Sequence, residues 1–185
     1  GVLFILLCLT AISAIILGMG MTTTAVYITV AALIVPSLIE AGIIPIAAHM
    51  FAFYFGVVST ITPPVALASF AGAAIAKSPP MATAVESSKV GIAKYIVPFA
   101  FVYNPSLLME GPIIWSLYSL IAVLLAYWLM TLGLEGWCNG KLNSYKRTLV
   151  LLGSVTLLIP PLEIIYGFNG FYYNLVGLLV LLIIY

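Results

Sequence analysis

The sequence predicts an all-α membrane protein that crosses the bilayer several times. Hydrophobic residues make up 64% of the 185 positions and charged residues only 6%, against roughly 25% charged in a soluble domain. The apolar residues form long continuous runs, which a transmembrane barrel of short alternating strands does not have. These observations exclude a water-soluble enzyme and a disordered chain.

The charged residues exclude further classes of protein. Six Lys and Arg against five Asp and Glu leave a net charge of +1, so the chain has no basic surface for nucleic acid. The sequence contains no Asp, which excludes an aspartyl intramembrane protease, and no P-loop pattern for nucleotide binding. Cys8 and Cys138 are expected to be free thiols. The chain starts at Gly1 and ends in an apolar run, so we interpret it as part of a longer membrane protein.

The first two apolar segments are short and flank a polar break. Val2–Leu17 and Ala25–Glu40 are separated by the Gly/Thr-rich stretch Gly18–Thr24. Each segment gives roughly 24 Å of helix, less than the ~30 Å hydrocarbon core. This favours a re-entrant hairpin over residues 2–40, whose tip must lie inside protein or beside water. Two ordinary spans joined by a surface turn remain an alternative.

The third segment, residues 45–76, is divided by two prolines. Pro63 and Pro64 remove backbone donors and disfavour helix just before them, which predicts a discontinuous helix, Pro45–Val58 and Val65–Ala76. A simple proline kink is the alternative. The polar segment Met81–Lys94 predicts an interfacial helix. Further apolar segments follow at Tyr95–Met109 (ending near Asn104-Pro105), Pro112–Leu134, Thr148–Tyr166 (broken at Pro160-Pro161) and, after a turn at Gly167–Gly170, Phe171–Tyr185.

The basic residues predict the orientation. They fall in two loops separated by two crossings, and the excess of cations places both loops on the cytoplasmic side. The hairpin then enters from the extracytoplasmic side, where Glu40 and Glu110 also lie. The six residues are Lys77, Lys89, Lys94, Lys141, Lys146 and Arg147.

Interrupted helices of this kind are typical of the binding sites of secondary transporters. The carboxyl end of a half-helix offers carbonyl groups to a cation, and the amino end offers N–H groups to an anion. Both breaks are rich in neutral oxygen, and the scarcity of intramembrane acids argues against a proton relay, so we expect sodium as the coupling ion. The candidate ligands are Gly18, Gly20, Ser59, Thr60 and Thr62.

Other polar residues allow more than one interpretation. The run Thr22, Thr23 and Thr24 could bind a substrate carboxylate, or merely cap the helix that follows. His49 is expected to be a hydrogen-bonded packing residue rather than a ligand. An intramembrane enzyme using Ser59 and His49 needs them about 3 Å apart, yet ten helical positions separate them by about 15 Å. A purely structural membrane domain is the third alternative.

Four motifs occur in order along the chain, at Leu17–Tyr27, Ala47–Phe55, Ser59–Ala68 and Phe99–Pro105. Together they resemble the large membrane (permease) subunit of TRAP transporters, and most closely the fused permeases that work with TAXI-type binding proteins. The resemblance covers roughly Val2–Gly111. The family often has proline where this chain has Thr22, which implies a less rigid tip or different substrate contacts.

The resemblance implies the second inverted repeat of an elevator-type transporter over residues 1–111, with hairpin 2–40, broken helix 45–76, and interfacial helix and span 81–109, followed by a C-terminal extension over 112–185. It implies that the Gly18–Thr24 tip and the Ser59–Val65 break line the sodium and substrate sites, which adds Val65 to the sodium ligands. It further implies an ATP-independent symporter of the bacterial or archaeal cytoplasmic membrane that takes up an organic acid. Its partners would be an extracytoplasmic substrate-binding protein and a small membrane subunit, separate or fused upstream, with no cofactor beyond Na⁺.

Overall fold

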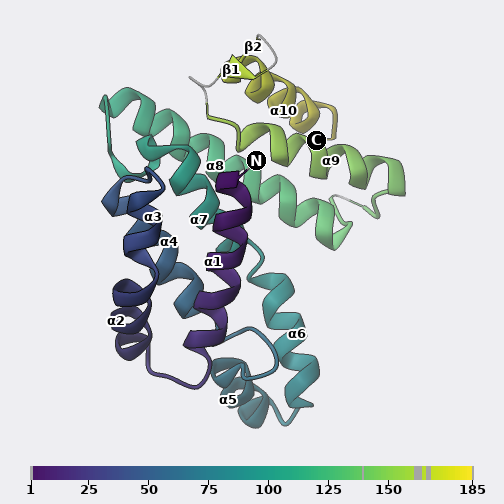
Figure 1. Ribbon diagram of the computed structural model, residues 1–185. Coiled ribbons are helices and arrows are strands. Elements are labelled where there is room, and N and C mark those ends of the chain that lie inside the picture. Colours follow the sequence, from purple (N-terminus) through teal and green to yellow (C-terminus); the bar gives the residue numbers. More distant parts are fainter. Residues whose placement is uncertain (1, 139, 161–163, 166–167, 185) are drawn as a thin grey trace. The chain divides into compact units, whose positions relative to one another are not determined.

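The computed structural model describes residues 2–138, 140–160, 164–165 and 168–184. The described residues form helices and one short antiparallel ribbon, β1 (Ile164–Ile165) with β2 (Phe168–Asn169). The chain divides into two compact units, Gly1–Val102 and Tyr103–Tyr185, whose elements are labelled in Figure 1. The predicted division after Gly111 stays a prediction.

The first unit begins with two antiparallel helices, α1 (Val2–Gly18) and α2 (Thr23–Leu33), joined by a turn over residues 19–22 (Figure 1). Gly20 adopts a φ of 80° in this turn, a conformation that glycine tolerates best. The predicted helix Ala25–Glu40 is interrupted at Ile34, and α3 (Val35–Glu40) completes it. Pro36 explains the interruption, because its ring has no N–H to donate to the preceding turn.

The predicted discontinuous helix is present as α4 (Pro45–Val58) and α5 (Leu67–Ala76). We call the non-helical residues 59–66 between them the break. The second half begins two residues later than predicted, because the chain folds back on itself: the Leu67 amide donates to Val65 O at 2.9 Å and the Ala68 amide donates to Thr60 O at 3.0 Å. The interruption is therefore longer than a proline kink.

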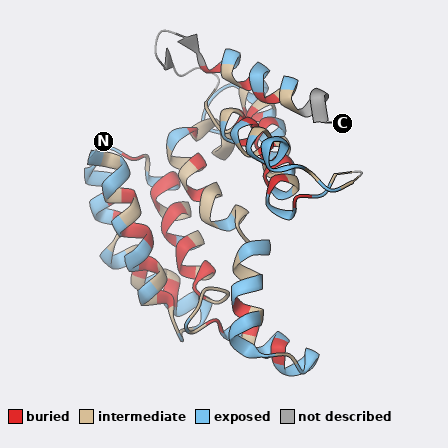
Figure 2. Cartoon of the chain, turned by 90° about the vertical axis from the view of Figure 1, so that its right-hand side faces the viewer, coloured by how far each residue is buried: buried red, intermediate tan, exposed pale blue. Residues whose placement is uncertain are grey.

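Helix α4 is the centre of the first unit, in contact with α1, α2 and α3 and buried along much of its length (Figure 2). The rings of Phe51 and Phe55 lie 4.8 Å apart at a tilt of 54°, and both meet Phe99 of α7 (Ala93–Tyr103) edge-on, at 5.3 and 5.7 Å. Aromatic pairs in such geometry each add about 1 kcal/mol beyond the area they bury. The aromatic cluster thus fixes α7 on α4.

The predicted interfacial segment forms α6 (Pro80–Val90), which packs against α5. Lys77 ends α5 in the left-handed conformation, with φ 53°, and the chain reverses there. Helix α7 then ends at Tyr103, the place the sequence predicts from Asn104-Pro105, because the residue before a proline is disfavoured in a helix.

The second unit contains a 3₁₀ turn, η1 (Pro105–Leu108), and helices α8 (Ile113–Glu135), α9 (Ser144–Leu157) and α10 (Gly170–Ile184). Helix α9 contacts both α8 and α10. Gly177 lets α10 approach closely, since a Cβ there would lie 2.8 Å from Gly153 O. The core cluster of this unit consists of Ala126, Leu129, Val150 and Leu157.

Among the described residues, α8 is the one helix long and apolar enough to cross a membrane by itself, and shorter apolar helices include α1, α2, α4 and α5. Helix α9 differs from the predicted span Thr148–Tyr166. It starts at Ser144, whose amide is capped by Asn143 Oδ1 at 2.7 Å, and it ends at Leu157. Pro161 and Gly167 lie outside the described residues.

Candidate cation and substrate site

The end of α1 meets the end of α4 at Gly18 and Ser59. Both residues are buried, and a Cβ added at Gly18 would lie 2.6 Å from both Ser59 Oγ and Gly56 O. Any side chain at Gly18 would therefore push the two backbones apart. The structure thus brings the first residue of the Gly/Thr-rich stretch into contact with the first residue of the break.

The hydroxyl groups that follow α4 turn back onto the helix. Ser59 Oγ donates to Gly56 O at 2.6 Å, Thr60 Oγ1 to Val57 O at 2.8 Å, and Thr62 Oγ1 to Val58 O at 2.7 Å. Each hydroxyl has one proton to donate and two lone pairs. The break therefore contains three hydroxyl oxygens whose protons are all donated to carbonyl groups of the helix.

The carbonyl groups in this region are paired, contrary to the expectation that the carboxyl end of the half-helix would offer them to a cation. The carbonyl oxygens from Gly56 to Ile61 each accept a hydrogen bond, from the three hydroxyls, from amides one turn onward, from Ala68 N or from Ser88 Oγ. The physical reason is that Ser and Thr side chains satisfy backbone groups where a helix ends. A cation bound in the break would therefore be coordinated by the lone pairs that these hydrogen bonds leave free.

The remaining predicted residues occupy the turn and the first residues of α2. Thr22 Oγ1 accepts a hydrogen bond from the Ala25 amide at 3.4 Å, so this threonine caps α2. Thr22, Thr23 and Thr24 are exposed, and Gly20 has open space around its Cα. These residues are not packed into the contact between Gly18 and Ser59. Val65 is half-buried in the break, and its carbonyl accepts from the Leu67 amide.

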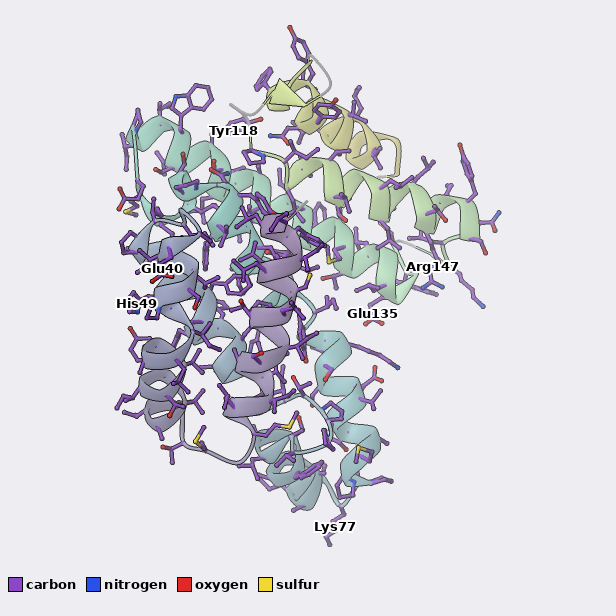
Figure 3. All side chains as sticks on the ribbon, in the orientation of Figure 1. Glu40, His49, Lys77, Tyr118, Glu135 and Arg147 are labelled. Carbon is purple, nitrogen blue, oxygen red and sulfur yellow. The ribbon has the colours of Figure 1, made fainter. Side chains whose placement is uncertain are left out.

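His49 does not approach Ser59. Its Nδ1 lies 3.0 Å from Tyr27 OH, and it lies on α4 toward α2 in Figure 3. Ser59 instead donates to Gly56 O. Since nucleophile and base must share a hydrogen bond, these two residues form no catalytic pair. Among the described residues, no group of three or more His, Cys, Asp or Glu could hold a metal ion.

Two residues that the sequence did not single out touch the break. Tyr95 OH lies 2.7 Å from Thr62 Oγ1, and Ser88 Oγ donates to Ile61 O at 3.0 Å. Both come from segments interpreted only as interfacial and membrane-entering, and neither belongs to a motif, so no spacing signal could have found them. A cavity of about 320 Å³ opens beside them, lined by Pro63, Val85, Ser88, Lys89, Ile92 and Tyr95.

Two charged residues of opposite sign, Lys77 and Glu40, lie at different levels of the first unit (Figure 3). Lys77 lies at the end of α5, and Glu40 lies toward the opposite end of the unit (Figure 3). Lys89 pairs with Glu86 at 3.0 Å on the exposed face of α6. Helix α4, with the contact between Gly18 and Ser59 at its carboxyl end, lies between the levels of Glu40 and Lys77.

Comparison with known proteins gives one finding. The family model described as "Tripartite ATP-independent periplasmic transporter, DctM component" matches residues 1–137. No curated protein and no solved structure matches the chain. The match covers most of the chain. It includes α1 and α2, the two halves of the broken helix, α4 and α5, and α8. The chain therefore belongs to the DctM family of membrane components of tripartite ATP-independent periplasmic transporters.

Proposed function

We propose that this chain contributes a cation site and a substrate-facing hairpin to a sodium-coupled permease for organic acids. The observation that carries the proposal is the contact between Gly18 and Ser59, because it joins two polar interruptions of otherwise apolar helices. Discontinuous helices that meet in this way supply the ion and substrate sites of secondary transporters. The family membership supports transport without ATP.

The cation site is proposed at the break. The lone pairs of Ser59, Thr60 and Thr62 are neutral oxygen ligands of the kind that hard cations take, and main-chain oxygens of Gly18, Gly20 and Val65 complete the proposed set. The hydroxyl protons point at helix carbonyls, which leaves lone pairs for a positive ion. A site built from neutral oxygens carries no charge of its own, so it suits a monovalent ion.

The substrate contact is proposed at Thr22, Thr23 and Thr24. These residues open α2, and the amides of a first helical turn have no partner within the helix. Exposed hydroxyls and amides at the positive end of a helix attract a carboxylate. The substrate would be delivered by an extracytoplasmic binding protein, with a small membrane subunit as the second partner. Membership of the fused TAXI-type subfamily is part of this proposal.

A purely structural role is the second candidate, and one observation favours it. The carbonyl groups from Gly56 to Ile61 are already paired, as they would be in a break that only shapes a membrane domain. The two candidates differ in what the hydroxyls do. A structural break needs their protons, whereas a cation site needs their lone pairs.

Uptake by the assembled transporter in proteoliposomes tests the proposal. A panel of radiolabelled mono- and dicarboxylates would be offered with its binding protein, under an inward sodium gradient or with choline instead. We expect uptake only with sodium, and a loss of more than about tenfold in Thr62→Ala and Gly20→Val. Thr131→Ala is the matched control, because Thr131, an exposed residue of α8, makes the same bond from its Oγ1 to a carbonyl four residues back, at 2.9 Å. Sodium-independent uptake, or equal uptake by Thr62→Ala and Thr131→Ala, would contradict the proposal.

A further inference from the structure

The turn between α6 and α7 packs against the break. We call residues 88–95 the corner. Its backbone is closed by short hydrogen bonds, from Gly91 N to Ser87 O at 2.8 Å and from Lys94 N to Gly91 O at 2.9 Å. A Cβ on Gly91 would lie 2.7 Å from Ile61 Cδ1. The corner is thus a compact element packed directly on the break.

Two hydroxyl groups of the corner hold specific atoms of the break. Ser88 Oγ donates to Ile61 O at 3.0 Å, and Tyr95 OH lies 2.7 Å from Thr62 Oγ1. Ser88 Oγ also lies 3.1 Å from Ala84 O, so its proton is shared between two carbonyls, and Tyr95 OH lies 3.3 Å from Ser88 Oγ. The two hydroxyls therefore reach neighbouring residues of the break, Ser88 from α6 and Tyr95 from α7.

The proton count fixes which residue donates in the contact between Tyr95 and Thr62. Thr62 has one hydroxyl proton, and it is donated to Val58 O at 2.7 Å. The contact with Tyr95 must then use the proton of Tyr95, and its 2.7 Å distance favours this bond over the 3.3 Å contact with Ser88. Thr62 Oγ1 consequently donates once, accepts once and keeps one lone pair, whose direction the two bonds determine.

We infer that Tyr95 is a positioning residue for the cation site, with Ser88 acting beside it on the neighbouring carbonyl. Tyr95 does not bind the ion. It aims the remaining lone pair of Thr62, and Ser88 holds the Ile61 carbonyl beside it. This inference rests on the proposed function, since it assigns a task within that site. Partners that orient metal ligands in this way typically change affinity by about 10- to 100-fold when removed.

The test is a sodium titration of uptake by the assembled transporter with Tyr95→Phe. We expect the half-saturating sodium concentration to rise about tenfold, while maximal uptake at saturating sodium is preserved. Tyr54→Phe is the matched control, because Tyr54 is a half-buried tyrosine of the same unit that packs edge-on against Phe101 at 5.4 Å. Ser88→Ala should give a smaller rise and Ser88→Thr should restore it. A tyrosine needed only for folding would lower maximal uptake without this split.

A second measurement separates failure of this inference from failure of the proposed function. Hydrogen exchange of the amides of residues 60–68 in the purified assembly should be faster in Tyr95→Phe than in Tyr54→Phe. An unchanged sodium titration in a sodium-dependent transporter overturns the inference alone. Sodium-independent wild-type uptake overturns the proposed function, and with it the role of Tyr95 in orienting a cation ligand. Faster exchange in Tyr95→Phe would then show only that Tyr95 holds the break in place, which we call the clamp. Equal exchange in both variants overturns the clamp as well.

Discussion

Gly56 of α4 is in direct contact with Val26 of α2, and its carbonyl faces Gly18 of α1. A Cβ on Gly56 would overlap Val26 Cγ1, and a Cβ on Gly18 would lie 2.6 Å from Gly56 O. Both helices of the hairpin therefore reach the backbone of α4 within one turn of the break. Close approach of this kind depends on residues without side chains.

Gly18→Ala is expected to destabilise the protein by about 1–3 kcal/mol, because the added methyl group overpacks a contact that is already closed. The loss should appear as a lower midpoint of thermal unfolding in detergent and as reduced uptake. Gly72→Ala is the control, since Gly72 lies within α5 and a methyl group added there would have nothing within 4 Å. Alanine is the better helix former by roughly 1 kcal/mol, so this variant should be neutral or more stable. Equal behaviour of the two variants would contradict the packing described for Gly18.

The hydrogen bond between Tyr27 and His49 is expected to stabilise the hairpin on α4 without taking part in transport. Tyr27→Phe removes the hydroxyl that lies 3.0 Å from His49 Nδ1 but keeps the edge-on contact with Phe53 at 5.7 Å. We expect a loss of about 1 kcal/mol in the free energy of unfolding and unchanged sodium dependence of uptake.

A double-mutant cycle with His49→Ala checks the assignment of that loss. The coupling energy should be about 1 kcal/mol if the two side chains act mainly on each other. Additive losses, or a transporter whose ion dependence changes with His49→Ala, would show that His49 does more than pack.

Much of the first unit could be predicted from sequence because the residues that end its helices act locally. The Gly/Thr stretch and Pro63-Pro64 set the ends of α1 and α4 to within one residue. The interruption before Pro36 was not predicted, because this proline stands inside a continuous apolar run that otherwise favours one helix. The pairing of the Ile61 carbonyl could not be predicted, since Ser88 Oγ reaches it from 27 residues away.

The same limit applies to the second unit. Its helices follow from apolar runs, but the partners of its buried polar groups depend on how the helices pack. Asn174 is 1% exposed within a segment interpreted only as the start of a span. With its amide nitrogen turned toward α9, it donates to Thr156 O at 2.7 Å and Ile159 O at 3.2 Å, and its oxygen accepts from Tyr118 OH at 3.2 Å. Nothing in the spacing of the sequence indicates these bonds.

Asn174→Leu is expected to lower the free energy of unfolding by about 1–3 kcal/mol, because it leaves the two carbonyls and the Tyr118 hydroxyl without this buried partner. Tyr118→Phe should cost less, since it removes one of the three bonds. The measurement is thermal unfolding of the purified protein. Leu179→Asn, an exchange in the opposite sense on the exposed side of α10, serves as a control for polarity alone. A neutral Asn174→Leu would show that the three bonds add nothing to stability.

Arg147 is expected to stabilise the carboxyl end of α8. Its Nε donates to Gly133 O at 3.0 Å and its Nη2 donates to Leu134 O at 2.8 Å, so the guanidinium occupies two of the carbonyls that a helix leaves unpaired. Arg147→Met should therefore lower the free energy of unfolding by about 1 kcal/mol, and Arg147→Lys by part of that, because an ammonium group lacks the planar fork. Lys146→Met removes the neighbouring exposed cation and should change stability by less than about 0.5 kcal/mol. Since the interaction is partly exposed, the difference in unfolding free energy between Arg147→Met and wild type should shrink at 1 M salt. Losses of equal size for Arg147→Met and Lys146→Met would indicate a general charge effect instead of a helix cap.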